Sequence, residues 1–424
     1  MINKIVSKFN PKKFFFIVFA CELINIFYYV GFLYQNHYLP APFIANKNDT
    51  LMDFYNPLFW VIKDGFYTVF NSVYPALNYY LLKIFAFGIS PDKVFNPIQL
   101  RNDFPVLGLI ISSFYLLIIW VIVNIGEWKK IQFCNKALIF LACTISVPVL
   151  FALERGNLIF FALLFLGLYL NASNSWSRAI FLGLLINVKP YFVLLLIQYL
   201  NIKQFNKFDL VRSLLTTALI FFGFSFFVGI NYVDFFEAFL SFSKNTTLTV
   251  EGVVALPHSI AALSTIKALI NFGDGSRYTF WFSLLKVINY STVALLLYIT
   301  LSRKLSPLEL LIACIVLLTN FSTSTGGYIL IIYITLIPYL IQSKEYKNLI
   351  IYILLIAVLP VDYVGILSIN YDESFSWLGK NYLLQNHDFY ISLGSLIRPI
   401  LNFSLMMNFL WLLLKKYPNT NAAK

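Results

Sequence analysis

Charged residues are scarce in this chain, and so are histidine and cysteine. Only 12% of the 424 residues are charged, against about 25% in soluble domains, which argues against a soluble globular fold. The three histidines, His37, His258 and His387, lie far apart in sequence and give no metal-ligand spacing. The four cysteines show no CxxC spacing, so neither a zinc site nor a disulfide framework is indicated.

The motifs of soluble enzymes are missing as well. No GxGxxG or P-loop sequence is present to hold a nucleotide, no Asp-x-Asp pair to hold a metal-bound nucleotide sugar, and no GxSxG or HExxH. The sequence therefore predicts no cofactor and gives no support for a divalent metal. The formal charge of +12 is best explained by basic residues that set membrane topology, not by nucleic-acid binding.

Apolar residues make up 59% of the chain and gather in about ten long runs. Each run is long enough, or nearly so, to cross a hydrocarbon layer of about 30 Å. The sequence predicts an all-α polytopic membrane protein of about 10–12 membrane segments, with residues 1–424 as one domain. Spans are predicted at about 14–34, 104–125, 136–153, 157–170, 210–230, 280–301, 307–322, 327–342, 348–364 and 389–414.

Lysine and arginine fall in alternate connections between these runs, which predicts a cytoplasmic amino terminus. Most acidic residues then lie outside, at Glu154 and in three loops at 35–103, 231–279 and 362–388. This bias has two explanations, a simple balance of the basic inner face or a carboxylate active site that faces outward.

The stretch 178–200 must enter and leave on the same side for this alternation to hold. Lys189-Pro190 divides it into two halves of about ten residues, and proline breaks a helix. A helical hairpin with Lys189 at its tip is favoured over one kinked span, which would invert every later loop.

The first outer loop places acids among aromatic residues. Pro57, Gly65 and Pro75 interrupt it, which predicts two short interfacial helices at about 56–63 and 76–87. Asp49 and Asp53 lie near Phe54 and Tyr55. Carboxylates beside flat rings suit sugars, whereas the alternative is an aromatic belt with solvated acids.

Charges also interrupt the apolar run "VLFALERGNLIFF", where Glu154 and Arg155 precede Gly156. The run from about 137 to 170 would be roughly 51 Å long as one helix, so the chain must turn, and Gly156 permits this. Non-helical backbone at membrane depth is tolerated where it is buried in protein or lines a wet cavity. Three more charges lie within predicted spans, each with either a functional or a structural role: Glu22, Lys286 and Arg398.

Several segments together resemble the GT-C glycosyltransferases, specifically the polyprenol-phosphate-mannose-dependent α-mannosyltransferase-like family. They are "MDFYNPLFWVIKDG" in the first outer loop, "ERGN" between two spans, "GLLINVKPYFVLL", and "LPHSIAAL". The late outer turn "NFSTSTGGYILIIY" departs from the family in having neither Trp nor His. The resemblance implies Asp53 as catalytic base and Arg155 and Lys189 as ligands of the donor phosphate. It implies substrate-binding roles for Glu154, Asn157, Tyr191, His258, Asp49 and Tyr55.

We therefore expect an inverting transferase that moves a mannose-like hexose from a polyprenyl-phosphate sugar to a glycan or lipid-linked acceptor. The expected location is the outer face of a bacterial cytoplasmic membrane, with membrane lipids and no nucleic acid as partners. A flippase for lipid-linked oligosaccharides, a polysaccharide polymerase or ligase, and a non-catalytic scaffold remain open alternatives.

Overall fold

In the computed structural model the chain is built mainly of helices. The structure describes residues 11–36, 39–40, 43, 50–70, 72–201, 207–228, 232–245, 256–265, 275–321, 327–357, 360–371, 374–376, 379–384 and 387–417. Five of the described helices are long and apolar enough to cross a membrane, which confirms the prediction of an all-α polytopic membrane protein at this level. They are α2 (Pro11–Asn36), α6 (Pro105–Ile122), α12 (Lys207–Val228), α15 (Gly275–Ser302) and α19 (Leu393–Lys416).

Shorter apolar helices fill the space between the long ones. Four of the long helices are less than 35% buried over their most apolar windows, whereas α16 buries nearly every residue from Glu309 to Asn320. Backbone breaks within a bilayer are tolerated where protein surrounds them, which fits the central position of the short helices. The short elements are α9 (Ile159–Asn171), α16 (Pro307–Phe321), η6 (Gly327–Leu336), α17 (Ile337–Gln342) and α18 (Leu349–Ala357).

The span predicted at 136–153 has a helical counterpart, and that counterpart is bent. It consists of α7 (Phe133–Thr144) and α8 (Val147–Arg155), with a bend of 53° between them. Pro148 lies in the first turn of α8. It has no backbone N–H to donate to a carbonyl of α7, and its ring would clash with that carbonyl if α7 continued as a helix. Ser146 stabilises the break, because its Oγ donates to the carbonyl of Cys143 at 2.8 Å.

Residues 175–200 run out and back as a hairpin. The first leg is α10 (Ser175–Val188), and the second combines η4 (Pro190–Leu196) with α11 (Ile197–Leu200). At the tip, Lys189 lies close enough to Asp53 for their charges to interact. At the base, the hydroxyl of Tyr199 hydrogen-bonds that of Tyr169, two residues before α9 ends and the chain turns into α10. The return leg thus reaches the side from which the hairpin began.

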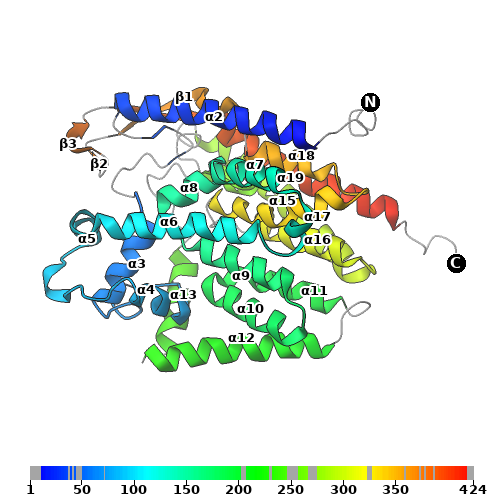
Figure 1. Cartoon of the computed structure of the whole chain (residues 1–424), viewed down its shortest axis with the longest axis horizontal. Helices are drawn as coiled ribbons and strands as arrows, with labels where there is room; N and C mark the ends of the chain where they lie inside the picture. Colours follow the sequence, from blue (N-terminus) through cyan, green and yellow to red (C-terminus); the bar gives the residue numbers. More distant parts are fainter. Residues whose placement is uncertain are drawn as a thin grey trace.

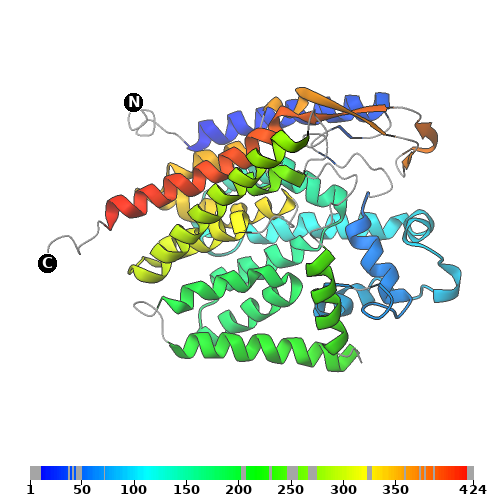
Figure 2. The same ribbon diagram turned by 180° about the vertical axis from the view of Figure 1, so that it is seen from behind.

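The two ends of the bundle carry different elements. One end, which we call the loop end, carries α3 (Met52–Ile62), α4 (Ala76–Lys83), η2 (Pro91–Lys93) and α5 (Pro97–Asp103). The helices α3 and α4 correspond to the two predicted interfacial helices. Figures 1 and 2 show these elements gathered at one end, while α2 begins and α19 ends at the opposite one. The remaining helices of the described residues are η3 (Gly126–Lys130), α13 (Tyr232–Asn245), η5 (Ile260–Thr265) and η7 (Pro360–Tyr363).

Strands occur in the third outer loop, predicted at 362–388, where the sequence indicated no strands. β1 (Gly365–Tyr371) pairs antiparallel with β4 (His387–Ser392), and β2 (Ser374–Ser376) pairs with β3 (Gly379–Leu384). The chain therefore leaves the bundle after η7 as a β-ribbon and returns directly into α19. Figure 1 shows the ribbon beside α2, with β2 and β3 on the side of the loop end.

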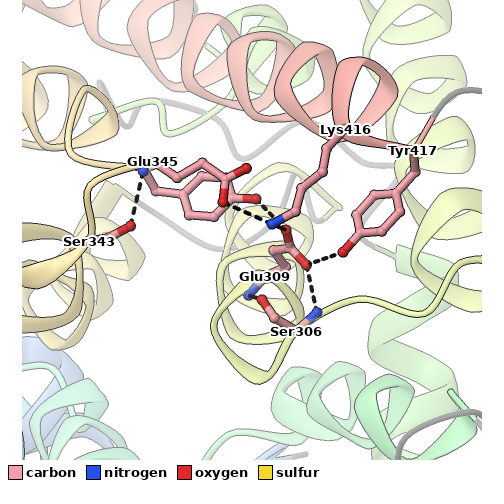
Figure 3. A network of polar contacts seen from close by, with 7 residues as sticks. Ser306, Glu309, Ser343, Glu345, Lys416 and Tyr417 are labelled. Atoms are coloured by element: carbon pink, nitrogen blue, oxygen red, sulfur yellow. Dashed lines mark hydrogen bonds and ion pairs between the residues drawn. The ribbon is translucent and has the colours of Figure 1, made fainter.

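The opposite end, which we call the basic end, is held together by the network drawn in Figure 3. Glu309 is fully buried, accepts the backbone N–H of Ser306 at 2.6 Å and pairs with the ammonium of Lys416 at 2.8 Å. Lys416 also pairs with Glu345 at 2.8 Å. This network joins the start of α16, the end of α19 and the connection between α17 and α18.

Candidate active site

Asp53 lies in the first turn of α3, at the loop end. The residue before that helix, Leu51, adopts a left-handed conformation with φ of 61°, and its N–H donates to the carbonyl of Glu154 at 2.7 Å. Residues other than glycine rarely adopt this backbone conformation. We infer that the contact between α3 and α8 stabilises it at Leu51. The start of α3 is therefore bound to the end of α8.

Gly156 forms the turn that sequence analysis predicted after Arg155. Its φ of 65° is left-handed, the usual way to end a helix. A Cβ at this position would lie 3.0 Å from the Cβ of Phe54 and 3.3 Å from the backbone of Leu51. The absent side chain thus lets the end of α8 approach the start of α3, which brings Arg155 to Asp53.

The carboxylate of Asp53 receives two side-chain bonds from this turn. One Nη of Arg155 lies 2.5 Å from Oδ1, and Nδ2 of Asn157 donates to Oδ2 at 2.5 Å. The carbonyl oxygen of the Asn157 side chain accepts the N–H of Ile159 at 2.9 Å, which caps the start of α9. Asp53 and Arg155 keep 16% and 17% of their side-chain surfaces exposed, so a ligand can reach both.

Lys189 brings a second cation to the same place. Its ammonium lies 4.8 Å from the ring centre of Tyr74 and 5.7 Å from that of Tyr328, and its charge interacts with Asp53. Burial lowers the pKa of the Lys189 ammonium to about 8, while the negative charge of Asp53 opposes that shift. Arg155, Asp53 and Lys189 form what we call the charged cluster.

The tip that carries Lys189 is fixed by an amide from the first outer loop. Pro190 has no backbone N–H, so it cannot satisfy the carbonyls at the end of α10. Nδ2 of the fully buried Asn78, on α4, donates to the carbonyls of Asn187 at 3.2 Å and Val188 at 3.0 Å. Because Asn78 bonds these carbonyls, the Lys189 ammonium is not needed to satisfy them. It lies instead over the rings of Tyr74 and Tyr328, near Asp53.

Tyrosines surround the cluster. The hydroxyl of Tyr74 interacts electrostatically with Asp53 and Arg155, and that of Tyr191 with Tyr74 and Tyr328. All three rings are half-buried. Tyr191, a predicted substrate-binding residue, is therefore a neighbour of the cluster.

Tyr55, an expected substrate-binding residue, does not contact the charged cluster through its hydroxyl. It is fully buried, and its hydroxyl donates to the carbonyl of Phe104 at 2.8 Å and accepts the N–H of Gly108 at 2.8 Å. Burial raises the pKa of its phenol to about 12, so the hydroxyl remains a donor. Tyr55 joins α3 to the start of α6, and Phe54 is equally buried.

The other predicted substrate-binding residues have varied positions. Glu154 is buried and contributes its backbone carbonyl to the bond with Leu51. His258 is also buried, and its carbonyl accepts from Asn402 on α19 at 2.6 Å. Asp49 lies outside the described residues.

The three charges predicted within spans have three different environments. Arg398 pairs with Asp362 at 2.6 Å in full burial, a structural arrangement. Lys286 is exposed on the surface of α15. Glu22 is 1% exposed and borders an apolar cavity between α2, α7 and α18, with a volume of about 20 Å³.

Sequence analysis missed three residues of the site: Tyr74, Asn78 and Tyr328. Asn78 was visible as the one amide within the otherwise apolar or aromatic "ALNYYLL" of α4, and Tyr328 as the aromatic residue after the Gly-Gly pair of the late outer turn. Tyr74 gave no comparable signal, because the chain has 27 tyrosines.

Within the described ranges, no group of three His, Cys, Asp or Glu side chains could hold a metal ion. Comparisons with protein-family models, with curated proteins and with solved structures found no match to this chain.

Proposed function

We propose that this protein is a GT-C-type membrane glycosyltransferase that moves a hexose from a polyprenyl-phosphate sugar to a glycan or lipid-linked acceptor at the extracytoplasmic face. The observation that carries the proposal is the charged cluster, one carboxylate and two cations gathered from the first outer loop, the end of α8 and the hairpin tip. These three segments lie far apart in sequence, and the folded chain brings their charges to one place.

The cluster supplies the groups that such a transfer requires. Asp53 takes the proton from an acceptor hydroxyl as its oxygen attacks the anomeric carbon, with inversion. The bond between that carbon and the phosphate oxygen breaks, and the polyprenyl phosphate leaves. Arg155 and Lys189 bind the phosphate and stabilise the charge that develops on it. Asn157 orients the carboxylate through its bond to Oδ2.

The ion pair between Arg155 and Asp53 also indicates an order of binding. The carboxylate must be released from this pair before it can accept the proton of an acceptor hydroxyl. A phosphate that draws the guanidinium toward itself weakens this pair and releases the carboxylate for the acceptor. The donor therefore binds before the acceptor.

A transfer assay tests the proposal. Purified protein in lipid nanodiscs should release polyprenyl phosphate from a polyprenyl-phosphate hexose and extend an added glycan acceptor, with opposite anomeric configuration in the product. Mannosyl and glucosyl donors are both supplied, since the sugar is part of the question. Donor hydrolysis or transfer that is equal in Arg155→Ala and native protein would contradict the assignment of the cluster.

Donor binding should weaken as the pH rises. The Lys189 ammonium has a pKa of about 8, so it loses its proton as the pH passes through that value. At about one pH unit above the pKa only about a tenth of the groups are charged, and affinity should fall by up to about tenfold. The phosphodiester keeps its single charge throughout. Binding of a labelled donor between pH 7 and pH 9 measures the effect, and Lys189→Arg, which stays charged, should show a flat profile.

A further inference from the structure

The faces of Tyr74 and Tyr328 meet the Lys189 ammonium from two elements that are far apart in sequence. The ring centres lie 4.8 Å and 5.7 Å from Nζ, within the range of cation–π contacts. Tyr74 precedes α4 in the first outer loop, and Tyr328 lies at the start of η6. The two rings and the ammonium thus form one group beside Asp53.

Both rings are held in place by contacts away from the ammonium. Tyr328 stacks on Phe151 with the ring planes 13° apart. The carbonyl of Tyr74 accepts from the hydroxyl of Tyr67 at 2.7 Å, and its N–H donates to Oγ of Ser72 at 3.2 Å. The rings therefore keep their positions when the ammonium moves.

Other rings near Asp53 are already packed. Phe54 is fully buried and meets Phe85 edge to face. Tyr115, also fully buried, stacks on Phe160 with ring centres 4.3 Å apart. Tyr74 and Tyr328 are half-buried, and each has the Lys189 ammonium over its ring, so a ligand that displaces the ammonium would meet these two rings.

A phosphate in the cluster would draw the ammonium off the rings. An ion pair in a partly buried site is stronger than a cation–π contact, so the ammonium follows the anion. The ring faces are then bare and lie beside the phosphate. In a polyprenyl-phosphate sugar the group bonded to the phosphate is the hexose, and one face of a hexose presents C–H groups.

We propose that Tyr74 and Tyr328 form the sugar subsite of the donor, where the apolar face of the hexose takes the place of the Lys189 ammonium over the two rings. This inference rests on the proposed function. Phe54 and Tyr55, the aromatic residues next to Asp53 in sequence, are both fully buried and are not part of this subsite.

The test compares two lipids on each protein sample, undecaprenyl phosphate and its mannosyl or glucosyl ester, whichever ester the native protein binds more tightly. In Tyr74→Leu and Tyr328→Leu the affinity for the sugar ester should fall by about fivefold to tenfold. Affinity for the sugar-free phosphate should stay constant or rise, because the rings no longer hold the ammonium. The ratio of the two affinities is the readout, so a partly misfolded sample does not distort it.

Tyr74→Phe and Tyr328→Phe keep the ring and should keep the native ratio. Tyr80→Leu is the matched control, since Tyr80 lies in the same loop and is 48% exposed. If removal of either ring lowers the affinity for both lipids equally, the rings serve only to position Lys189, and the sugar subsite is refuted. If the native protein binds neither lipid, the proposed function itself fails, which is a distinguishable result.

Discussion

Asp53→Asn should abolish sugar transfer and at the same time tighten the binding of polyprenyl phosphate. Loss of a general base lowers the rate by about 10²- to 10⁴-fold. The same change removes a negative charge that competes with the phosphate for Arg155 and repels it. Two unit charges about 4 Å apart near a protein surface interact by roughly 4 kcal/mol, so a gain of about tenfold in affinity is a modest expectation.

A lower transfer rate together with a higher phosphate affinity would distinguish a general base that competes for Arg155 from a residue that only orients Arg155. An asparagine keeps the size of the side chain and can still accept from Asn157, so the fold should be preserved. Rate is measured by release of polyprenyl phosphate, and affinity by titration of the sugar-free lipid. Asp64→Asn is the control, because Asp64 lies in the same loop, is exposed and is bonded to the hydroxyl of Tyr79 at 3.1 Å. Full turnover in Asp53→Asn would rule out the base, whereas weaker phosphate binding would show that Asp53 orients Arg155 instead of competing with the ligand.

Removal of Arg398 should give the largest loss of stability in the described part of the chain. Arg398 and Asp362 are both fully buried, with 2.6 Å between them, and Nε of Arg398 also donates to the carbonyl of Ile356 at 2.8 Å. Arg398→Met leaves a carboxylate buried without its cation, which costs about 3–5 kcal/mol. Equilibrium unfolding in mixed micelles, followed by tryptophan fluorescence, measures this loss.

The double variant Arg398→Met with Asp362→Asn tests the cause. If the loss comes from the unpaired charge, the double variant should be more stable than the sum of the two single changes predicts. Arg212→Met is the matched control, since Arg212 and Asp209 form a partly exposed pair at 2.7 Å, and such pairs contribute about 1 kcal/mol or less. Equal losses in Arg398→Met and Arg212→Met would contradict the argument from burial.

The helices were largely predictable from sequence, because lipid requires long apolar runs and each predicted span has a helical counterpart. The break between α7 and α8 was overlooked although Pro148 signals it. The ribbon from β1 to β4 was missed because the third outer loop mixes polar and aromatic residues without a clear alternation.

The site was predictable where charge interrupts an apolar run. Arg155 and Lys189 stand out for this reason, and Asp53 stands out among the aromatic residues of its loop. Asn78, Tyr74 and Tyr328 could not be selected in the same way, since their roles depend on which segments meet in space. Tyr55 was chosen for its place beside Asp53 in sequence, but successive residues of a helix point in different directions, and it faces the core.

The bonds from Asn78 to the end of α10 imply an order of assembly. The first leg of the hairpin, α10, is about 21 Å long at helical rise, shorter than the roughly 30 Å of hydrocarbon, so lipid alone does not set the depth of the tip. Asn78 and the carbonyl of Asn187 are 109 residues apart, and α4 is synthesised first. The first outer loop is therefore already outside the ribosome when the hairpin emerges, and it serves as the template on which Lys189 is placed during insertion.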